Sequence, residues 1–86
     1  MTATYRQRLD VVAEAIVRSV DHRQPTTYRE VAADIGLPVS VVHARCRRLV
    51  DRGLLTHAPG IPRTLRCDPS VVVLPGRGVH QMERIG

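Results

Sequence analysis

Apolar residues recur every three or four positions over the first quarter of the chain. From Thr4 to about His22 they are Tyr5, Leu9, Val12, Ala13, Ile16, Val17 and Val20. This spacing predicts one helix with a single buried stripe. Thr4 and Gln7 have the spacing of a capping box, so we expect the helix to begin at Thr4. Pro25 ends it, because proline has no amide hydrogen and clashes with a continuing helix.

A second helix is predicted from Tyr28 to about Ile35. Thr27 and Glu30 form a second capping box in front of it. Its inner face would carry Tyr28, Val31, Ala32 and Ile35. Gly36 can adopt the left-handed conformation that ends a helix.

A third helix is predicted from Val41 to Arg52, with Ser40 as its N-cap. One side carries the apolar residues Val42, Cys46, Leu49 and Val50. The other side carries Val41, His43, Ala44, Arg47 and Arg48, with Arg45 at the flank. This is the pattern of a basic amphipathic helix. We expect Gly53 to end it.

Two short runs follow, residues 54–58 and 63–67, on either side of a turn rich in proline and glycine. They predict a β-hairpin. Alternation supports this, since Leu65 and Cys67 would point one way and Thr64 and Arg66 the other.

The remaining residues form a tail. Residues 71–74 are apolar and predict a buried strand or a contact with a partner subunit. Residues 75–78 should form a loop, and residues 79–85 a short frayed helix or a disordered end. We therefore divide the chain into a domain at 1–69 and a tail at 70–86.

The charge points to a polyanionic partner. The net charge is +5 and the isoelectric point about 10.6, which favours nucleic acid. All thirteen basic residues are arginine. A GC-rich genome would explain the use of arginine in place of lysine, and so would bidentate binding of phosphate and guanine by arginine.

Other classes of function find little support in the composition. The only aromatic residues are Tyr5 and Tyr28, too few for stacking on single strands. Cys46 and Cys67 lack the spacing of a zinc site, so we expect no metal or other cofactor. We interpret Cys46 as a small core residue, with a redox switch as the alternative.

The acidic residues Asp10, Glu14, Glu30, Asp34 and Asp51 fall on helix exteriors, and no catalytic grouping is recognisable. We expect no enzyme and no small-molecule substrate. The chain has no apolar run long enough to span a membrane. We expect a cytoplasmic, nucleoid-associated protein.

The order of helices and hairpin, with these residues, resembles the winged helix-turn-helix regulators. The nearest likeness is to the amino-terminal DNA-binding domain of LexA-type repressors and to modules of the MarR-like group. It rests on Thr27, Glu30, Val31, Ala32, Ile35, Gly36, Leu37, Ser40, Val42, Leu49, Arg52, Gly53, Leu54 and Leu55. Gly60, Arg63 and Leu65 match the wing loosely, and the resemblance covers residues 1–69. It implies an α+β, mainly α, fold with three helices and a two-stranded wing.

The resemblance implies binding to double-stranded DNA, with the third helix in the major groove and the wing on neighbouring backbone or minor groove. The candidate DNA-binding residues are Arg29, Ser40, Val41, His43, Ala44, Arg45, Arg47, Arg48, Arg63 and Arg66. For each, a solvated surface or capping role is the alternative. Among them, Val41 and Ala44 suit thymine methyl groups, and Arg63 suits a narrow minor groove.

We expect a small transcriptional regulator, or a phage or mobile-element factor that organises DNA. The alternative is a winged-helix adaptor that binds another protein. A homodimer through the tail or the first helix is a separate hypothesis, motivated by the apolar residues 71–74.

Overall fold

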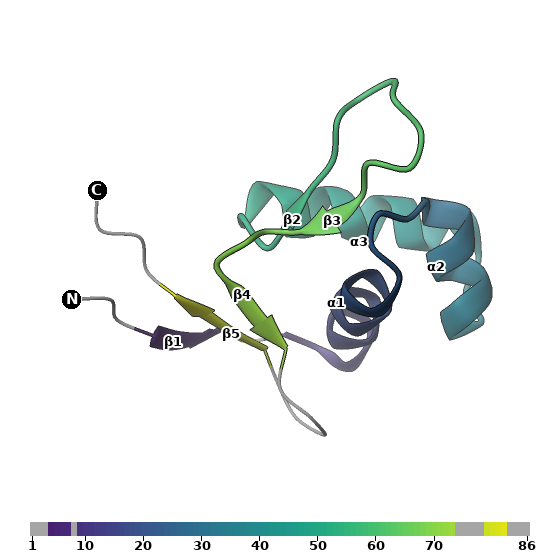
Figure 1. Cartoon of the computed structure of the whole chain (residues 1–86). Helices are drawn as coiled ribbons and strands as arrows, with labels where there is room; N and C mark the ends of the chain where they lie inside the picture. The colour runs from purple at the N-terminus through teal and green to yellow at the C-terminus, as the bar shows by residue number, and fades with distance from the viewer. Residues whose placement is uncertain (1–3, 8, 74–78, 83–86) are drawn as a thin grey trace.

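The computed structural model describes residues 4–7, 9–73 and 79–82. Its helices are α1 (Val11–Arg23), α2 (Tyr28–Ile35) and α3 (Val39–Asp51). Its strands are β1 (Thr4–Gln7), β2 (Leu55–Thr56), β3 (Arg66–Cys67), β4 (Val71–Val73) and β5 (Val79–Met82). Figure 1 shows the β2–β3 hairpin extending beyond the helices and the other three strands on another side of them. The predicted class, mainly α with three helices followed by a two-stranded hairpin, is confirmed.

The start of α1 differs from the prediction. Thr4 is not a helix cap, because residues 4–7 form β1 and pair with β5 in an antiparallel ladder. The N-cap is Asp10, whose carboxylate accepts a hydrogen bond of 2.7 Å from the Ala13 amide. Aspartate is a better N-cap residue than threonine, and Asp10 lies just before the apolar stripe. The helix therefore starts at Val11.

The second helix and the turn after it agree with the prediction. Thr27 caps α2 by accepting a hydrogen bond of 3.1 Å from the Glu30 amide. Gly36 ends the helix with φ of 73°, a left-handed conformation in which its amide donates to the Ala32 carbonyl. This tight ending turns the chain directly into α3.

Helix α3 begins earlier than predicted. It starts at Val39, with Pro38 as N-cap, and no side chain caps it. The Pro38 carbonyl instead accepts the amides of Val41 and Val42, each at 3.1 Å. Ser40 is therefore not the cap but lies exposed in the first turn.

The hairpin forms the wing. Leu55 pairs with Cys67, and Thr56 pairs with Arg66. Leu65 is fully buried and exchanges backbone hydrogen bonds with Thr26, at 3.0 and 3.3 Å, which attaches the wing to the start of α2. Cys67 is also buried and Arg66 is exposed, as the alternation predicted.

The tail adds a second sheet. Strands β1, β5 and β4 form an antiparallel sheet in that order. A helix or disorder was predicted from residue 79, and this is wrong for residues 79–82, which form β5 between two partners. The long-range pairing with β1 decides their conformation. The loop predicted at 75–78 lies outside the described residues.

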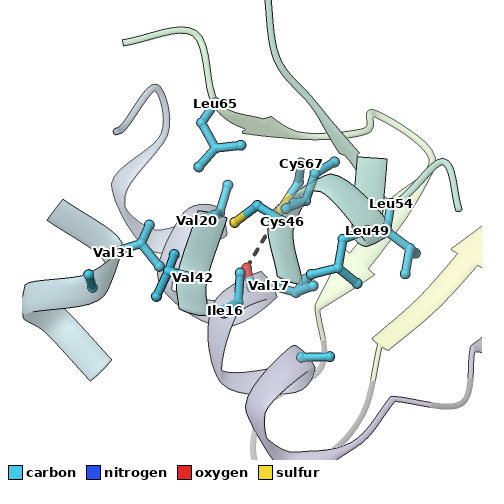
Figure 2. Close-up of a cluster of buried hydrophobic side chains, with 13 residues drawn as sticks. Ile16, Val17, Val20, Val31, Val42, Cys46, Leu49, Leu54, Leu65 and Cys67 are labelled. Carbon is cyan, nitrogen blue, oxygen red and sulfur yellow. Dashed lines mark hydrogen bonds between the residues drawn. The ribbon is translucent and has the colours of Figure 1, made fainter. Parts of the chain in front are cut away.

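The core is aliphatic, and all three helices and the wing contribute to it (Figure 2). Its buried residues include Ile16, Val17, Val20, Val31, Val42, Cys46, Leu49, Leu54, Leu55, Leu65 and Cys67. Each large side chain buried in this way contributes about 1.5–3 kcal/mol of hydrophobic free energy. The inner stripe of α3 is thus fixed in the core, and this determines which residues its outer face presents.

Candidate nucleic-acid interface

The outer face of α3 is exposed along its length. Val42 and Cys46 have no exposed surface and Leu49 has 2%, so the helix has one firmly buried stripe. The opposite residues are all exposed: Val39, Ser40, Val41, His43, Ala44, Arg47 and Arg48. Val39 was not among the predicted site residues, because the helix was expected to start after it.

The arginines of α3 fall into two groups. Within the part of the chain that the structure describes, Arg47 and Arg48 form no ion pair. Arg45 lies at the flank, as predicted, and its side chain is only 35% exposed because it pairs with Asp10 at 2.5 Å. Arg47 and Arg48 therefore present unneutralised positive charge, and Arg45 does so only in part.

Small and apolar side chains lie among these charges. Ser40, Val41, Ala44, Arg45 and Arg48 line one shallow depression on α3. Val41 is 39% exposed, and Ala44 is short enough to let another molecule approach the helix. Such a surface offers both hydrogen-bond donors and methyl contacts.

The wing arginine does not extend freely from the hairpin. Arg63 has φ of 57°, and its guanidinium pairs with Glu30 of α2 at 2.6 Å. Glu30 also accepts a hydrogen bond of 3.1 Å from the Thr26 hydroxyl. Arg63 remains 65% exposed, and it lines a depression together with Arg29 at the junction of α2 and the wing. Arg66 is exposed on β3.

Three rings lie together between α3 and the wing, and we call them the His–Tyr–His cluster: His43, Tyr28 and His57. The Tyr28 ring is 4.7 Å from that of His43, edge-on at 71°, and 5.0 Å from that of His57. The Tyr28 hydroxyl and the His57 Nδ1 form a hydrogen bond of 3.2 Å. Burial raises the pKa of Tyr28, so its hydroxyl stays protonated at neutral pH.

Sequence reasoning did not place Tyr28 or His57 at the site. Tyr28 was assigned to the inner face of α2, and His57 was only part of the first predicted hairpin run, residues 54–58. The two are 29 positions apart, so no local pattern signals their contact. Only the packing of the wing against α2 brings them together.

Neither cysteine offers a reactive group at this surface. Cys46 is completely buried and Cys67 nearly so. Burial raises the pKa of each thiol to about 12, which keeps both protonated and unreactive. Among the described residues, no three His, Cys, Asp or Glu side chains are grouped to hold a metal ion. No helix there is long and apolar enough to cross a membrane.

Three helices followed by a hairpin attached to the second helix define a winged helix-turn-helix domain. The family model for winged helix-turn-helix DNA-binding domains matches residues 9–56, more than half of the chain. The chain therefore belongs to this DNA-binding family, which confirms the resemblance seen in the sequence.

The curated relatives are more specific in name. The chain is 40% identical over 50 residues to the LexA repressor of Limosilactobacillus reuteri (strain DSM 20016), and equally to that of Limosilactobacillus reuteri subsp. reuteri (strain JCM 1112). The match covers 57% of this chain and 24% of each relative. It thus spans about a quarter of their length. No solved structure shows a significant match.

Proposed function

We propose that this protein binds duplex DNA sequence-specifically by placing the outer face of α3 in the major groove. The observation that carries this proposal is the exposed face that holds Arg47 and Arg48 without a carboxylate partner among the described residues. An α-helix fits the major groove, where arginine binds guanine bidentately and methyl groups contact thymine. Because the matched relatives are named repressors, we propose that the protein represses transcription next to its site. A phage or mobile-element factor that organises DNA would use the same surface.

Six side chains of α3 have roles in this proposal. Arg47 and Arg48 bind guanine edges or phosphates, and Val41 and Ala44 contact thymine methyl groups. The Ser40 hydroxyl does not cap α3, and in this proposal it donates to a phosphate. Arg45 contributes at the edge, where a phosphate competes with Asp10 for its guanidinium.

The second helix and the wing bind the flanking backbone. Arg29 and Arg63 line one depression at their junction, so a single phosphate strand can meet both. Arg63 is already held in place by Glu30, which orients its exposed guanidinium. Arg66 is exposed on the same hairpin and adds positive charge.

Affinity for duplex DNA over a salt series tests the proposal. Arg47→Ala and Arg48→Ala should weaken binding, and loss of one phosphate contact should make the slope of log affinity against log salt shallower by about 0.9. Loss of one base contact should instead cost about 1–3 kcal/mol, and only on the selected site. Arg18→Ala removes the same charge from α1, where Arg18 pairs with Glu14, and serves as the matched control.

Absence of duplex binding at low salt would reject the proposal. The protein-adaptor function would then be the better account of the exposed α3 face. Equal losses in the Arg18 control and in the α3 variants would reject the assignment of α3 and leave only binding by overall charge.

A further inference from the structure

The His–Tyr–His cluster lies in a groove in which the roles proposed above use only Arg47. The groove is lined by the three rings together with Arg47, Val50 and Asp51 of α3 and Pro59 and Gly60 of the wing. It thus lies between the two elements proposed to bind DNA. A duplex held by both would pass a backbone strand across its mouth.

We propose that this groove is a phosphate-binding subsite, in which His43, His57 and Arg47 hold one backbone phosphate of duplex DNA and bind it more tightly as the imidazoles gain protons. The subsite rests on the proposed DNA-binding function and adds to it a pH-dependent contact. Its ligand is a phosphodiester, which suits imidazolium and guanidinium donors.

Tyr28 positions His57 in both of its protonation states. In the neutral tautomer with its proton on Nε2, Nδ1 accepts from the Tyr28 hydroxyl across their 3.2 Å contact, and Nε2–H is available to an anion. In the protonated ring, Nδ1–H donates to the Tyr28 oxygen instead. The ring therefore keeps its place while its charge changes.

The surrounding charges couple protonation to phosphate binding. Arg47 and Asp51 line the groove from α3, with opposite charges. On the far side of His57, Arg29 and Arg63 line the second depression, and Glu30 of α2 pairs with Arg63. A phosphate bound in the groove would favour the positively charged imidazole. By linkage, a lower pH then strengthens DNA binding.

The expected size of the pH effect on DNA affinity follows from counterion release. Because the subsite holds a single phosphate, protonation of its imidazoles should steepen the slope of log affinity against log salt by at most about 0.9. At ~0.1 M salt, the same contact should raise the affinity roughly tenfold.

The experiment measures duplex affinity over a salt series at about pH 8 and about pH 5.5, which bracket the range where histidine changes charge. The proteins are the wild type, His43→Gln, His57→Gln, and the double variant. His22→Gln is the control, because His22 is an exposed histidine in the last turn of α1, outside the groove. Circular dichroism at both pH values establishes that each protein stays folded.

The wild type and His22→Gln should both bind more tightly and with a steeper salt slope at the lower pH. Each single groove variant should lose part of this gain, and the double variant all of it. Binding at pH 8 that does not strengthen at pH 5.5 would overturn the subsite alone. A gain retained in the double variant would do the same. No duplex binding at either pH would overturn the DNA-binding function as well.

Discussion

Asp10 connects two helices through one carboxylate. One oxygen accepts the Ala13 amide and caps α1, while the other pairs with Arg45 of α3. The Ala13 hydrogen bond, followed by that from Arg45, holds the pKa of Asp10 below its ordinary value of 3.8. Asp10 thus caps α1 and also places Arg45 at the edge of the proposed DNA-binding surface.

This carboxylate should make stability depend on pH in the acid range. Its pKa is lower in the folded chain than in the unfolded chain, so its contribution is fully present above the unfolded pKa. It is lost as pH falls through the folded pKa. Urea unfolding at about pH 6 and about pH 2.5 should show a smaller acid-induced loss for Asp10→Asn than for the wild type.

Asp34 provides the comparison for this prediction. Its pKa is also lowered, first by the hydrogen bond from Arg23, so Asp34→Asn should remove a similar part of the pH dependence. Acid-induced losses equal to that of the wild type in both variants would contradict the assigned ion pairs.

Local interactions made some residue roles predictable from sequence. The Thr27 cap and the Gly36 ending each involve partners within four positions, so the sequence pattern is sufficient. Thr4 and Ser40 have the same local signature and are not caps. Asp10 and Pro38 begin those helices instead, and sequence spacing alone does not rank one cap candidate above another.

At the scale of elements, the wing is held by the core rather than by its own short ladder. Strands β2 and β3 pair over only two residues each, which is too little for a hairpin to be stable alone. Leu65, fully buried, and its backbone bonds to Thr26 supply the attachment to α2. The hydroxyl of Thr64 orders the loop by donating to the Ile61 carbonyl at 2.9 Å and accepting from the Ala58 amide at 3.0 Å.

Leu65→Ala should therefore destabilise the domain by about 2–5 kcal/mol, because it leaves a cavity between the wing and α2. Ile61→Ala, at a position 57% exposed in the same loop, should change stability by less than about 0.5 kcal/mol. Chemical denaturation followed by circular dichroism measures both. Equal effects of the two substitutions would show that the wing is not anchored through Leu65.

The elements that sequence predicted poorly are those that depend on distant partners. Helix and wing positions followed from periodicity and turn residues, to within a few residues at the ends, except that α1 begins at Val11 and not at Thr4. Strands β1 and β5 pair residues from opposite ends of the chain, and nothing local distinguishes them from a helix start and a frayed tail. The Arg63–Glu30 pair and the Tyr28–His57 contact were not predicted either, because each joins residues far apart in the sequence.

At the scale of the whole molecule, the three-stranded sheet is built from the chain ends and not from the hairpin (Figure 1). Val72 of β4 is 40% exposed, and Val11 at the start of α1 is 85% exposed. Among the residues whose exposure the structure describes, these are the exposed large apolar residues on the two elements that we propose for a homodimer, the tail and the first helix. A dimer would present two α3 helices to one duplex.

Light scattering after size exclusion should then find two chains on one selected duplex. The selected site should consist of two half-sites related by two-fold symmetry, with centres one helical turn apart or a multiple of it. One chain on an asymmetric site would contradict the dimer and would leave the DNA-binding surface of each chain unchanged.

The central claim is that the outer face of α3 binds duplex DNA, and titration of the labelled protein with duplex, followed by backbone amide shifts, tests it most directly. The largest changes should fall on Val39–Asp51, with further changes at His57 and Arg63 in the wing. The Val11–Arg23 helix should change little. Shifts concentrated on that helix or on β4, with α3 unaffected, would contradict the account.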